Sequence, residues 1–184
     1  LPAQILAAVG PYGFWHYYMH TGDKQTMIDV YPAVRKYLGI WELDQDGLTA
    51  YRNGDWSWGD WGDNQDKALI QAGWHYLALE GTASMAEALG YESDAEAYRT
   101  VMVKVAEGFN ACWTGTEYRH PAYKKLSDDR VQALAVLSGI AGEDKYPQIA
   151  EFLKKTEHAS PYFEKYVMEA LFKMGEGEYA MTRC

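Results

Sequence analysis

The apolar residues of this 184-residue chain recur mainly at helical spacing, and no segment sustains an alternation of apolar and polar residues. Apolar side chains three and four positions apart share one side of a helix, so this spacing predicts amphipathic helices. Gly10-Pro11 interrupts the first helix, because proline lacks the N–H that a helix interior needs. The predicted helices cover residues 5–20, 24–43, 65–89, 95–109, 128–141, 146–155 and 161–174, with another beginning near 176. The predicted fold class is all-α.

Several helix ends carry specific start and stop residues. Asp23 is placed to cap the helix over 24–43, and Ser127 is placed to cap the helix over 128–141. Ser160-Pro161 combines a capping serine with a proline at the first helical position. Gly90 and Gly175 follow the last apolar residues of their helices, where a left-handed backbone is common.

The connections between the predicted helices alternate between short and long. Short connections join the first helix to the second, the third to the fourth, the fifth to the sixth and the seventh to the eighth, which predicts antiparallel hairpins. The long connections precede the third and fifth helices, and they hold most of the aromatic and charged loop residues. Hairpins stacked side by side would bring these loops to one face, as in a solenoid or a closed (α/α) toroid.

The loop over 54–66 reads GDWSWGDWGDNQD and has the most unusual composition in the chain. It holds three Trp and four Asp among three glycines, and no helix or strand period explains them. A concave site that stacks on one ring face and hydrogen-bonds polar edges fits this composition. A packed aromatic loop whose carboxylates cap the next helix is the alternative. For that cap, Asp63 and Asn64 are better placed than Asp60, and Asp66 would lie in the first helical turn.

The amino-acid composition argues against some classes of binding partner and favours others. The net charge of −9 argues against nucleic acid and against anionic membrane surfaces, which both select basic patches. The 15 Tyr and 7 Trp suit a surface that binds flat, partly polar ligands such as sugars. Cys112 and Cys184 show no metal spacing, and phosphate-binding loops and acyl-transfer motifs are missing, so we expect no cofactor and no metal.

Four stretches spread over nearly the whole chain resemble the catalytic domain of bacterial α-L-rhamnosidases, within the six-hairpin glycosidase superfamily. The stretches are GFWHYYMHTGDKQTMIDVYPAVRKYL (13–38), WSWGDWGDNQDKALIQAGWHYLAL (56–79), DDRVQALAVLSGIA (128–141) and HASPYFEKYVMEALFKMG (158–175). The resemblance implies an (α/α)6 toroid, of which residues 1–184 would supply about four of six hairpins.

The resemblance also implies a set of sugar-facing residues. In the family, the Asp and Trp of a GDW motif before an inner helix line the sugar pocket. Asp60 and Trp61 match that position best, with Asp55 and Trp56 as a competing register and Trp58 between them. The Ser-Pro-Tyr segment faces the pocket in the family, which points to Tyr162 and Glu164. The set of expected substrate-binding residues is Asp55, Trp56, Trp58, Asp60, Trp61, His158, Tyr162 and Glu164.

The acid and the base of the family have no counterpart in this sequence. The family's general acid lies in a motif ending near GWTGD, and its base is a Glu in a WE-type or EGW-type segment; neither motif occurs here. An inverting glycosidase needs both groups, one to protonate the leaving oxygen and one to activate water. We therefore expect a fragment that carries part of the sugar-binding wall and is inactive alone, from a periplasmic or secreted parent. Truncation would expose apolar faces on the end hairpins and favour self-association.

Other polar residues have simpler interpretations. The spacing of Asp60, Asp63 and Asp66 lacks the ligand pattern of a calcium loop. His16, His20 and His75 lie on aromatic helical faces and are expected in the core, whereas His120 and His158 lie in loops, and His158 is the better functional candidate. The segment 128–130, Asp-Asp-Arg, fits a capping and ion-pair cluster at least as well as sugar contact.

Two alternative functions stay open at this level. The chain could be an α-helical module that binds a glycan or peptide without catalysis, or part of a six-hairpin glycosidase of another specificity, such as an unsaturated glucuronyl hydrolase or a glucosidase.

Overall fold

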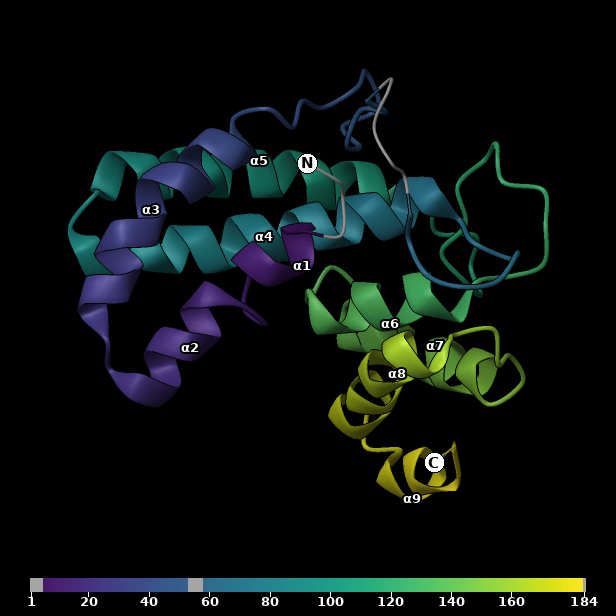
Figure 1. The fold of residues 1–184 in the computed structure, drawn as a ribbon. Coiled ribbons are helices and arrows are strands. Elements are labelled where there is room, and N and C mark those ends of the chain that lie inside the picture. The colour runs from purple at the N-terminus through teal and green to yellow at the C-terminus, as the bar shows by residue number, and fades with distance from the viewer. Residues whose placement is uncertain (1–4, 53–57, 184) are drawn as a thin grey trace. The chain divides into compact units, whose positions relative to one another are not determined.

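The computed structural model describes residues 5–52 and 58–183, which form two compact units (Figure 1). The first unit comprises residues 5–52 and 74–108, and the second comprises residues 58–73 and 109–183. The α-helices are α1 (Ile5–Val9), α2 (Phe14–Thr21), α3 (Lys24–Leu38), α4 (Lys67–Leu89), α5 (Glu92–Asn110), α6 (Asp129–Leu137), α7 (Tyr146–Leu153), α8 (Pro161–Lys173) and α9 (Gly177–Ala180). Short 3-10 turns cover Glu143–Lys145 and Met181–Arg183.

The all-α class predicted from apolar spacing is confirmed. In the described ranges, β-pairing is limited to two isolated antiparallel bridges, Leu43 with Thr49 and Trp113 with Tyr118. The four expected helix pairs are in contact: α2 with α3, α6 with α7, α8 with α9, and α4 with α5 through an ion pair of Arg99 with Glu87. No helix in the described part of the chain is long and apolar enough to cross a membrane.

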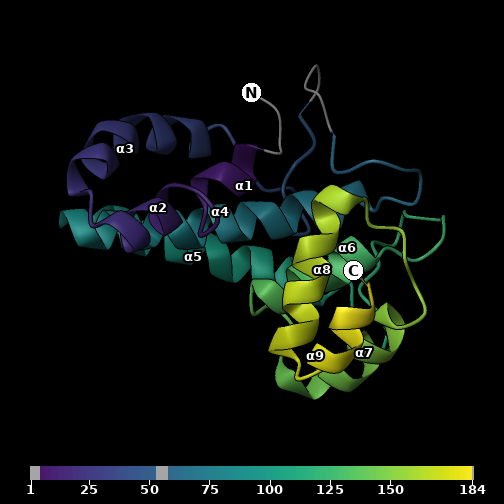
Figure 2. The same cartoon turned by 60° about the horizontal axis from the view of Figure 1, so that its bottom comes forward.

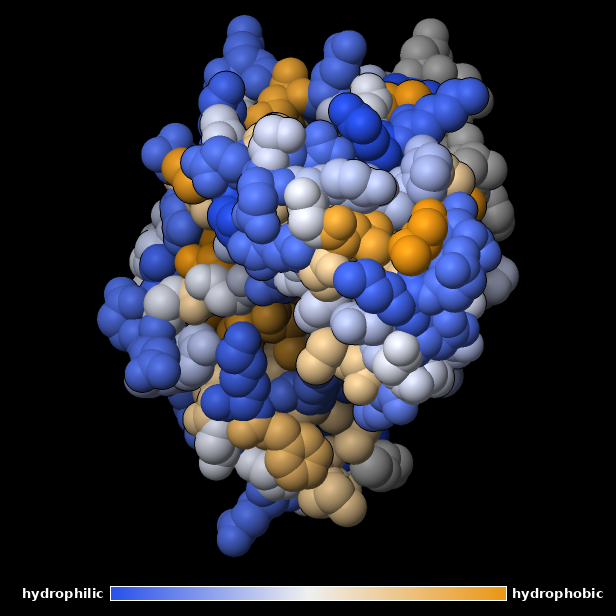
Figure 3. Space-filling model, turned by 90° about the vertical axis from the view of Figure 1, so that its left-hand side faces the viewer, coloured by the Kyte–Doolittle hydropathy of each residue, from blue (hydrophilic) through white to orange (hydrophobic). Residues whose placement is uncertain are grey.

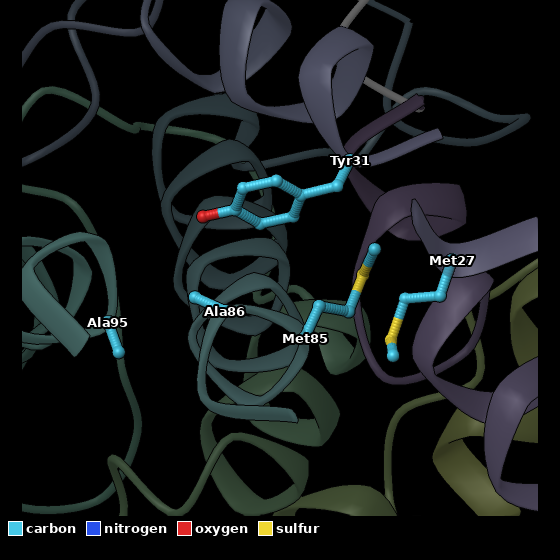
Figure 4. Close-up of a cluster of buried hydrophobic side chains, with 5 residues drawn as sticks. All are labelled: Met27, Tyr31, Met85, Ala86 and Ala95. Carbon is cyan, nitrogen blue, oxygen red and sulfur yellow. The ribbon is translucent and has the colours of Figure 1, made fainter. Parts of the chain in front are cut away.

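The first unit has its core where α3 packs on α4 and α5. Figure 4 shows Met27 of α3 and Met85 of α4 side by side, with Tyr31 over the same face of α4. The ring of Tyr31 stacks on Tyr91 with centroids 5.2 Å apart, and its hydroxyl donates to Asp94 Oδ2 at 2.9 Å. Tyr31 thus contributes apolar area to the core while its one polar group stays paired.

The interruption predicted at Gly10-Pro11 lets the chain pass very close to α4. α1 ends at Val9 and α2 begins at Phe14, so the predicted helix over 5–20 is two helices. A Cβ added to Gly81 of α4 would lie 2.6 Å from the carbonyl carbon of Gly10, and real side chains do not approach backbone atoms so closely. Only glycine at this position of α4 permits the contact.

α3 is shorter than its sequence pattern predicts. It starts as expected, with the side chain of Asp23 accepting from Thr26 N at 3.1 Å, but it ends at Leu38 rather than continuing to 43. Beyond it, Leu43 forms an antiparallel bridge with Thr49, and Ala50 N donates to Glu42 O at 2.9 Å. In the turn between them, Asp44 Oδ1 accepts from the backbone N–H groups of Asp46 and Leu48, each at 3.0 Å. A side chain that satisfies nearby backbone groups competes with helix in this way.

The histidines of the first unit divide into two environments. His75 is buried in α4, with Nδ1 3.0 Å from Thr49 Oγ1, as predicted for a core residue. His16 and His20 of α2 are exposed, so the prediction that they lie in the core is wrong. The aromatic residues of α2 do not mark a buried face, because none of its residues is buried and Tyr17 is exposed.

The second unit is built around α6. Residues 129–136 are all buried, and α6 packs mainly against α8. The first turns of α4 contribute Gly73, where an added Cβ would lie 2.9 Å from Leu134 Cβ. Figure 2 shows α8 along α6 and α9 beside α7, in agreement with a hydrogen bond from Tyr179 Oη to Lys154 O at 3.1 Å.

The helix starts in this unit differ from the sequence prediction at two places. Asp128, rather than Ser127, caps α6, with its side chain accepting from Arg130 N at 3.1 Å. Ser160 is the N-cap residue of α8 as predicted, but its side chain makes no capping hydrogen bond to the helix. The predicted stop at Gly175 is confirmed by its left-handed φ of 83°.

The surface mixes polar and apolar side chains. Figure 3 shows hydrophilic residues over most of one face, with hydrophobic residues interspersed among them. Large hydrophobic side chains of the first unit that are exposed include Tyr17, Met19, Ile28, Ile40, Tyr51, Tyr91 and Val103.

Candidate functional site

The candidate site lies in the second unit, where residues 58–66 of the loop over 54–66, here called the Trp/Asp loop, precede α4. Asp60 is only 2% exposed, and its Oδ2 accepts from Arg130 Nε at 2.6 Å and from Ser160 N at 2.9 Å. Ser160 Oγ donates to the other oxygen, Asp60 Oδ1. One carboxylate therefore joins the Trp/Asp loop, the start of α6 and the start of α8.

All three nitrogens of the Arg130 side chain donate hydrogen bonds within the site. Arg130 is 0% exposed and its guanidinium carries five N–H donors. Besides Nε, its Nη1 donates to Asp128 Oδ1 at 2.8 Å and to Asn64 O at 3.1 Å. Its Nη2 donates to Trp61 O at 3.0 Å and to His158 O. Burial acts to lower the pKa of Arg130, but the carboxylates of Asp128 and Asp60 outweigh it and raise the pKa, so the cation is retained.

The backbone of the loop is held by side chains at five consecutive carbonyls. Arg130 takes those of Trp61 and Asn64, Gln65 Nε2 takes those of Asp60 and Gly62, and Lys125 Nζ takes that of Asp63 at 3.0 Å. Residues 60–64, whose five carbonyls are all bonded to side chains, are therefore held in place. Their outward side chains are presented in a fixed arrangement.

Two further carboxylates connect this loop to its neighbours. Asp66, directly before α4, accepts from His120 N at 2.7 Å and from Leu69 N at 3.5 Å, so it caps the helix in place of Asp63 or Asn64. Burial raises the pKa of Asp66, and the His120 N–H opposes that shift. Asp129 Oδ2 accepts from His158 N at 2.9 Å and from Ala159 N at 3.0 Å.

The Asp-Asp-Arg segment is therefore a capping and ion-pair cluster. Asp128 caps α6, Asp129 fixes the segment before α8, and Arg130 fixes the Trp/Asp loop. All three residues are buried, which leaves no accessible side chain there for a ligand. The double acidic start of α6 is the sequence signal for this role.

Three aromatic side chains, the aromatic group Trp58, Trp61 and Tyr162, lie beside this anchor. The rings of Trp58 and Trp61 have centroids 5.6 Å apart at 74°, and those of Trp58 and Tyr162 are 5.6 Å apart at 46°. Trp61 is 66% exposed and Tyr162 is 42% exposed. Burial of part of the Tyr162 ring raises the pKa of its hydroxyl, which stays a hydrogen-bond donor at neutral pH.

Glu164 is engaged by Arg183 near the end of the chain. Arg183 Nε donates to Glu164 Oε1 at 2.5 Å and Nη2 donates to Oε2 at 3.0 Å. Glu164 also lines a cavity of about 630 Å³ together with Ala159, Pro161 and Lys165. Arg183 thus fixes the orientation of the Glu164 carboxylate at the edge of this cavity.

The remaining predicted residues are placed as follows. The ring of His158 is half-buried, and the backbone of this residue is held by Asp129 and Arg130. Asp55 and Trp56 lie outside the described residues. Sequence reasoning missed the anchoring role of Arg130 because its partners Asp60 and His158 are distant along the chain.

Comparisons with known proteins agree on one family. The family model described as bacterial alpha-L-rhamnosidase 6 hairpin glycosidase domain matches residues 5–181. An alpha-L-rhamnosidase of Streptomyces avermitilis is 26% identical over 103 residues, which are 56% of this chain and 10% of that protein. The chain thus spans about a tenth of the length of this relative.

Two solved structures share the fold. A GH78 family rhamnosidase of Bacillus sp. GL1 aligns with a TM-score of 0.76 and 23% identity over 92% of this chain and 20% of its own. The alpha-L-rhamnosidase from Dictyoglumus thermophilum aligns with a TM-score of 0.74 and 19% identity over 87% of this chain and 19% of its own. Because the family model covers nearly the whole sequence, the chain belongs to the bacterial alpha-L-rhamnosidase six-hairpin glycosidase domain family.

Proposed function

We propose that the chain is part of the catalytic domain of an α-L-rhamnosidase-like glycoside hydrolase that removes terminal rhamnosyl residues from glycans. The match of the family model over residues 5–181 carries the proposal. The aromatic group supports it, with Trp61 of the loop and Tyr162 of α8 exposed, because aromatic rings pack on the apolar faces of sugars. The chain would contribute about four of the six hairpins of an (α/α)6 toroid.

The aromatic group is proposed as the sugar-contacting surface. Trp61 and Tyr162 expose ring area to a ligand, and Trp58 packs against both. Asp60 is proposed as a positioning residue. Its carboxylate bonds to Arg130 and Ser160, which holds the loop and so fixes the indole of Trp61. The proposed sugar-contacting surface also includes His158, Glu164, Asp55 and Trp56.

The proposed reaction is an inverting hydrolysis whose general acid and general base lie outside this chain. An inverting enzyme places its two carboxyl groups about 6.5–9.5 Å apart, with room for the attacking water between the base and the sugar. Asp60, Asp128 and Asp129 are buried and bonded to arginine or backbone N–H groups, which suits support rather than proton transfer.

The test uses the intact parent protein and an aryl α-L-rhamnoside. Release of the aryl alcohol, with the product followed by NMR from the first turnover, would establish the activity and the inversion. Failure to cleave any aryl rhamnoside would overturn the proposal. Cleavage of an aryl glucoside or an unsaturated glucuronide instead would assign the other six-hairpin specificities, and sugar binding without turnover would assign a binding module.

Self-association is a further part of the proposal. Large hydrophobic side chains such as Met19, Ile28 and Val103 are exposed on the first unit, and burial of such area favours association. Sedimentation velocity of the chain is expected to show concentration-dependent oligomers. A single monomeric species at all concentrations would overturn this part.

A further inference from the structure

We propose that His16 and His20 form a binding site for a divalent transition cation, such as Zn²⁺, Cu²⁺ or Ni²⁺, on α2. The two residues are one helical turn apart, which places their side chains on the same side of the helix. Their Nε2 atoms are 2.6 Å apart, and their ring centroids are 4.4 Å apart at an interplanar angle of 36°. This proposal does not depend on the proposed hydrolase activity.

The geometry of the pair is close to that of a chelate. With Zn–N bonds of about 2.0–2.1 Å, two nitrogens in a tetrahedral site lie roughly 3.3 Å apart. The two Nε2 atoms therefore have to separate by only about 0.7 Å to admit the cation. Both side chains are exposed, so rotation about their side-chain bonds supplies this movement at little cost.

The tautomers of the two imidazole rings also allow both Nε2 atoms to bind a cation. A neutral imidazole carries one proton, and a hydrogen bond between two Nε2 atoms uses the proton of one ring and the lone pair of the other. When each ring keeps its proton on Nδ1, both Nε2 lone pairs are available to one cation. Neutral imidazole is the commonest protein ligand of these metals, so the pair matches them in chemistry.

The site provides two protein ligands and leaves the other positions to water. No group of three or more His, Cys, Asp or Glu that could hold a metal occurs among residues 5–52 and 58–183. Two imidazoles select nitrogen-preferring metals over Mg²⁺ and Ca²⁺, which require several oxygen ligands. Zn²⁺ binding is expected to be weaker than at a closed structural site with four protein ligands.

Isothermal titration of the untagged chain with ZnCl₂ tests the proposal. We expect saturable one-site binding, weakened at least about tenfold in His16→Gln and in His20→Gln, because either change removes the intramolecular second ligand. The matched control, His120→Gln, removes a histidine of the other unit and should leave the affinity unchanged. MgCl₂ and CaCl₂ should give no binding heat.

A second measurement guards against variants that fail to fold. Added Zn²⁺ should raise the melting temperature of the wild type in a concentration-dependent way, because it binds the folded helix, but not that of His16→Gln. Circular dichroism of both exposed-site variants should match the wild type before metal is added. Equal Zn²⁺ affinity in wild type and His16→Gln, or absence of saturable binding to the folded wild type, would overturn the proposal.

Discussion

Arg130 Nε donates to Asp60 Oδ2 at 2.6 Å, and neither side chain is exposed to solvent. Their positions differ by 70 residues, so the bond closes a large part of the second unit. Removing Asp60 would leave the buried Nε of Arg130 and the backbone N–H of Ser160 without this acceptor, and an unsatisfied buried donor costs more than the contact alone is worth.

Asp60→Ala is expected to lower the free energy of unfolding by about 1–3 kcal/mol, because Arg130 Nε and the N–H and O–H groups of Ser160 lose their acceptor while Arg130 keeps its ion pair with Asp128. Urea denaturation of the chain measures this loss. Asp63→Ala is the matched control: the same substitution at an exposed carboxylate of the same loop should change the unfolding midpoint little. Equal midpoints for Asp60→Ala and Asp63→Ala would show that the buried pair does not stabilise the fold.

Trp61→Ala in the parent enzyme is expected to weaken sugar binding, raising KM or Kd by roughly 2- to 10-fold, in line with about 0.5–1.5 kcal/mol for an aromatic contact. The melting temperature should stay close to that of the wild type, because the side chain is largely exposed. Leu126→Ala removes another exposed apolar side chain of the same unit and serves as the control. Unchanged affinity in Trp61→Ala would remove this ring from the sugar site.

Stability is expected to fall as the pH drops from 6.5 to 4, through His75. Burial lowers the pKa of His75 to about 4, whereas a histidine in the unfolded chain titrates near 6.5. In this window the unfolded state binds more protons, so the contribution of His75 is complete above pH 6.5 and decreases by up to about 3 kcal/mol on acidification.

Urea denaturation of the wild type and of His75→Gln at several pH values between 4 and 7 measures this contribution. The wild type should lose stability faster on acidification than His75→Gln does, whatever the absolute stability of the variant. His20→Gln removes an exposed histidine and controls for a general effect of the substitution. Parallel pH curves for wild type and His75→Gln would contradict the assignment.

Gly81→Ala is expected to destabilise the first unit by about 1–3 kcal/mol, because the new Cβ would overlap the backbone at Gly10 and α1 would have to shift. Thermal denaturation measures the change. Gly39→Ala offers a contrast, since its Cβ would meet its nearest atom, Arg35 O, at 3.4 Å in a right-handed backbone. That variant should be neutral or slightly stabilised, and equal losses for both glycines would refute the close-contact argument.

The sequence predicted those features that depend on neighbours in the chain. Asp23 capping α3 and Gly175 ending α8 follow from local backbone chemistry, and the structure confirms both. The early end of α3 at Leu38 was missed because apolar spacing continues beyond it, whereas the backbone at 42 and 43 pairs with residues 49 and 50.

The anchor of the candidate site depends on contacts that no local pattern records. Asp66 caps α4 while accepting from His120, and Arg130 meets Asp60, although each pair is distant in sequence. The composition of the loop over 54–66 was sufficient to select this segment as the candidate site. It could not tell that Asp60 faces inward and Trp61 faces solvent, because both residue types suit either place.

The bond between Asp60 and Ser160 also orders events during synthesis. The two residues are 100 positions apart, so the ribosome completes Ser160 roughly 5–20 s after Asp60 at about 5–20 residues per second. Until then Asp60 lacks the N–H and O–H donors of Ser160, although Arg130, which is 70 positions after Asp60, has already been made. The loop can therefore be held by α6 before it is joined to the start of α8.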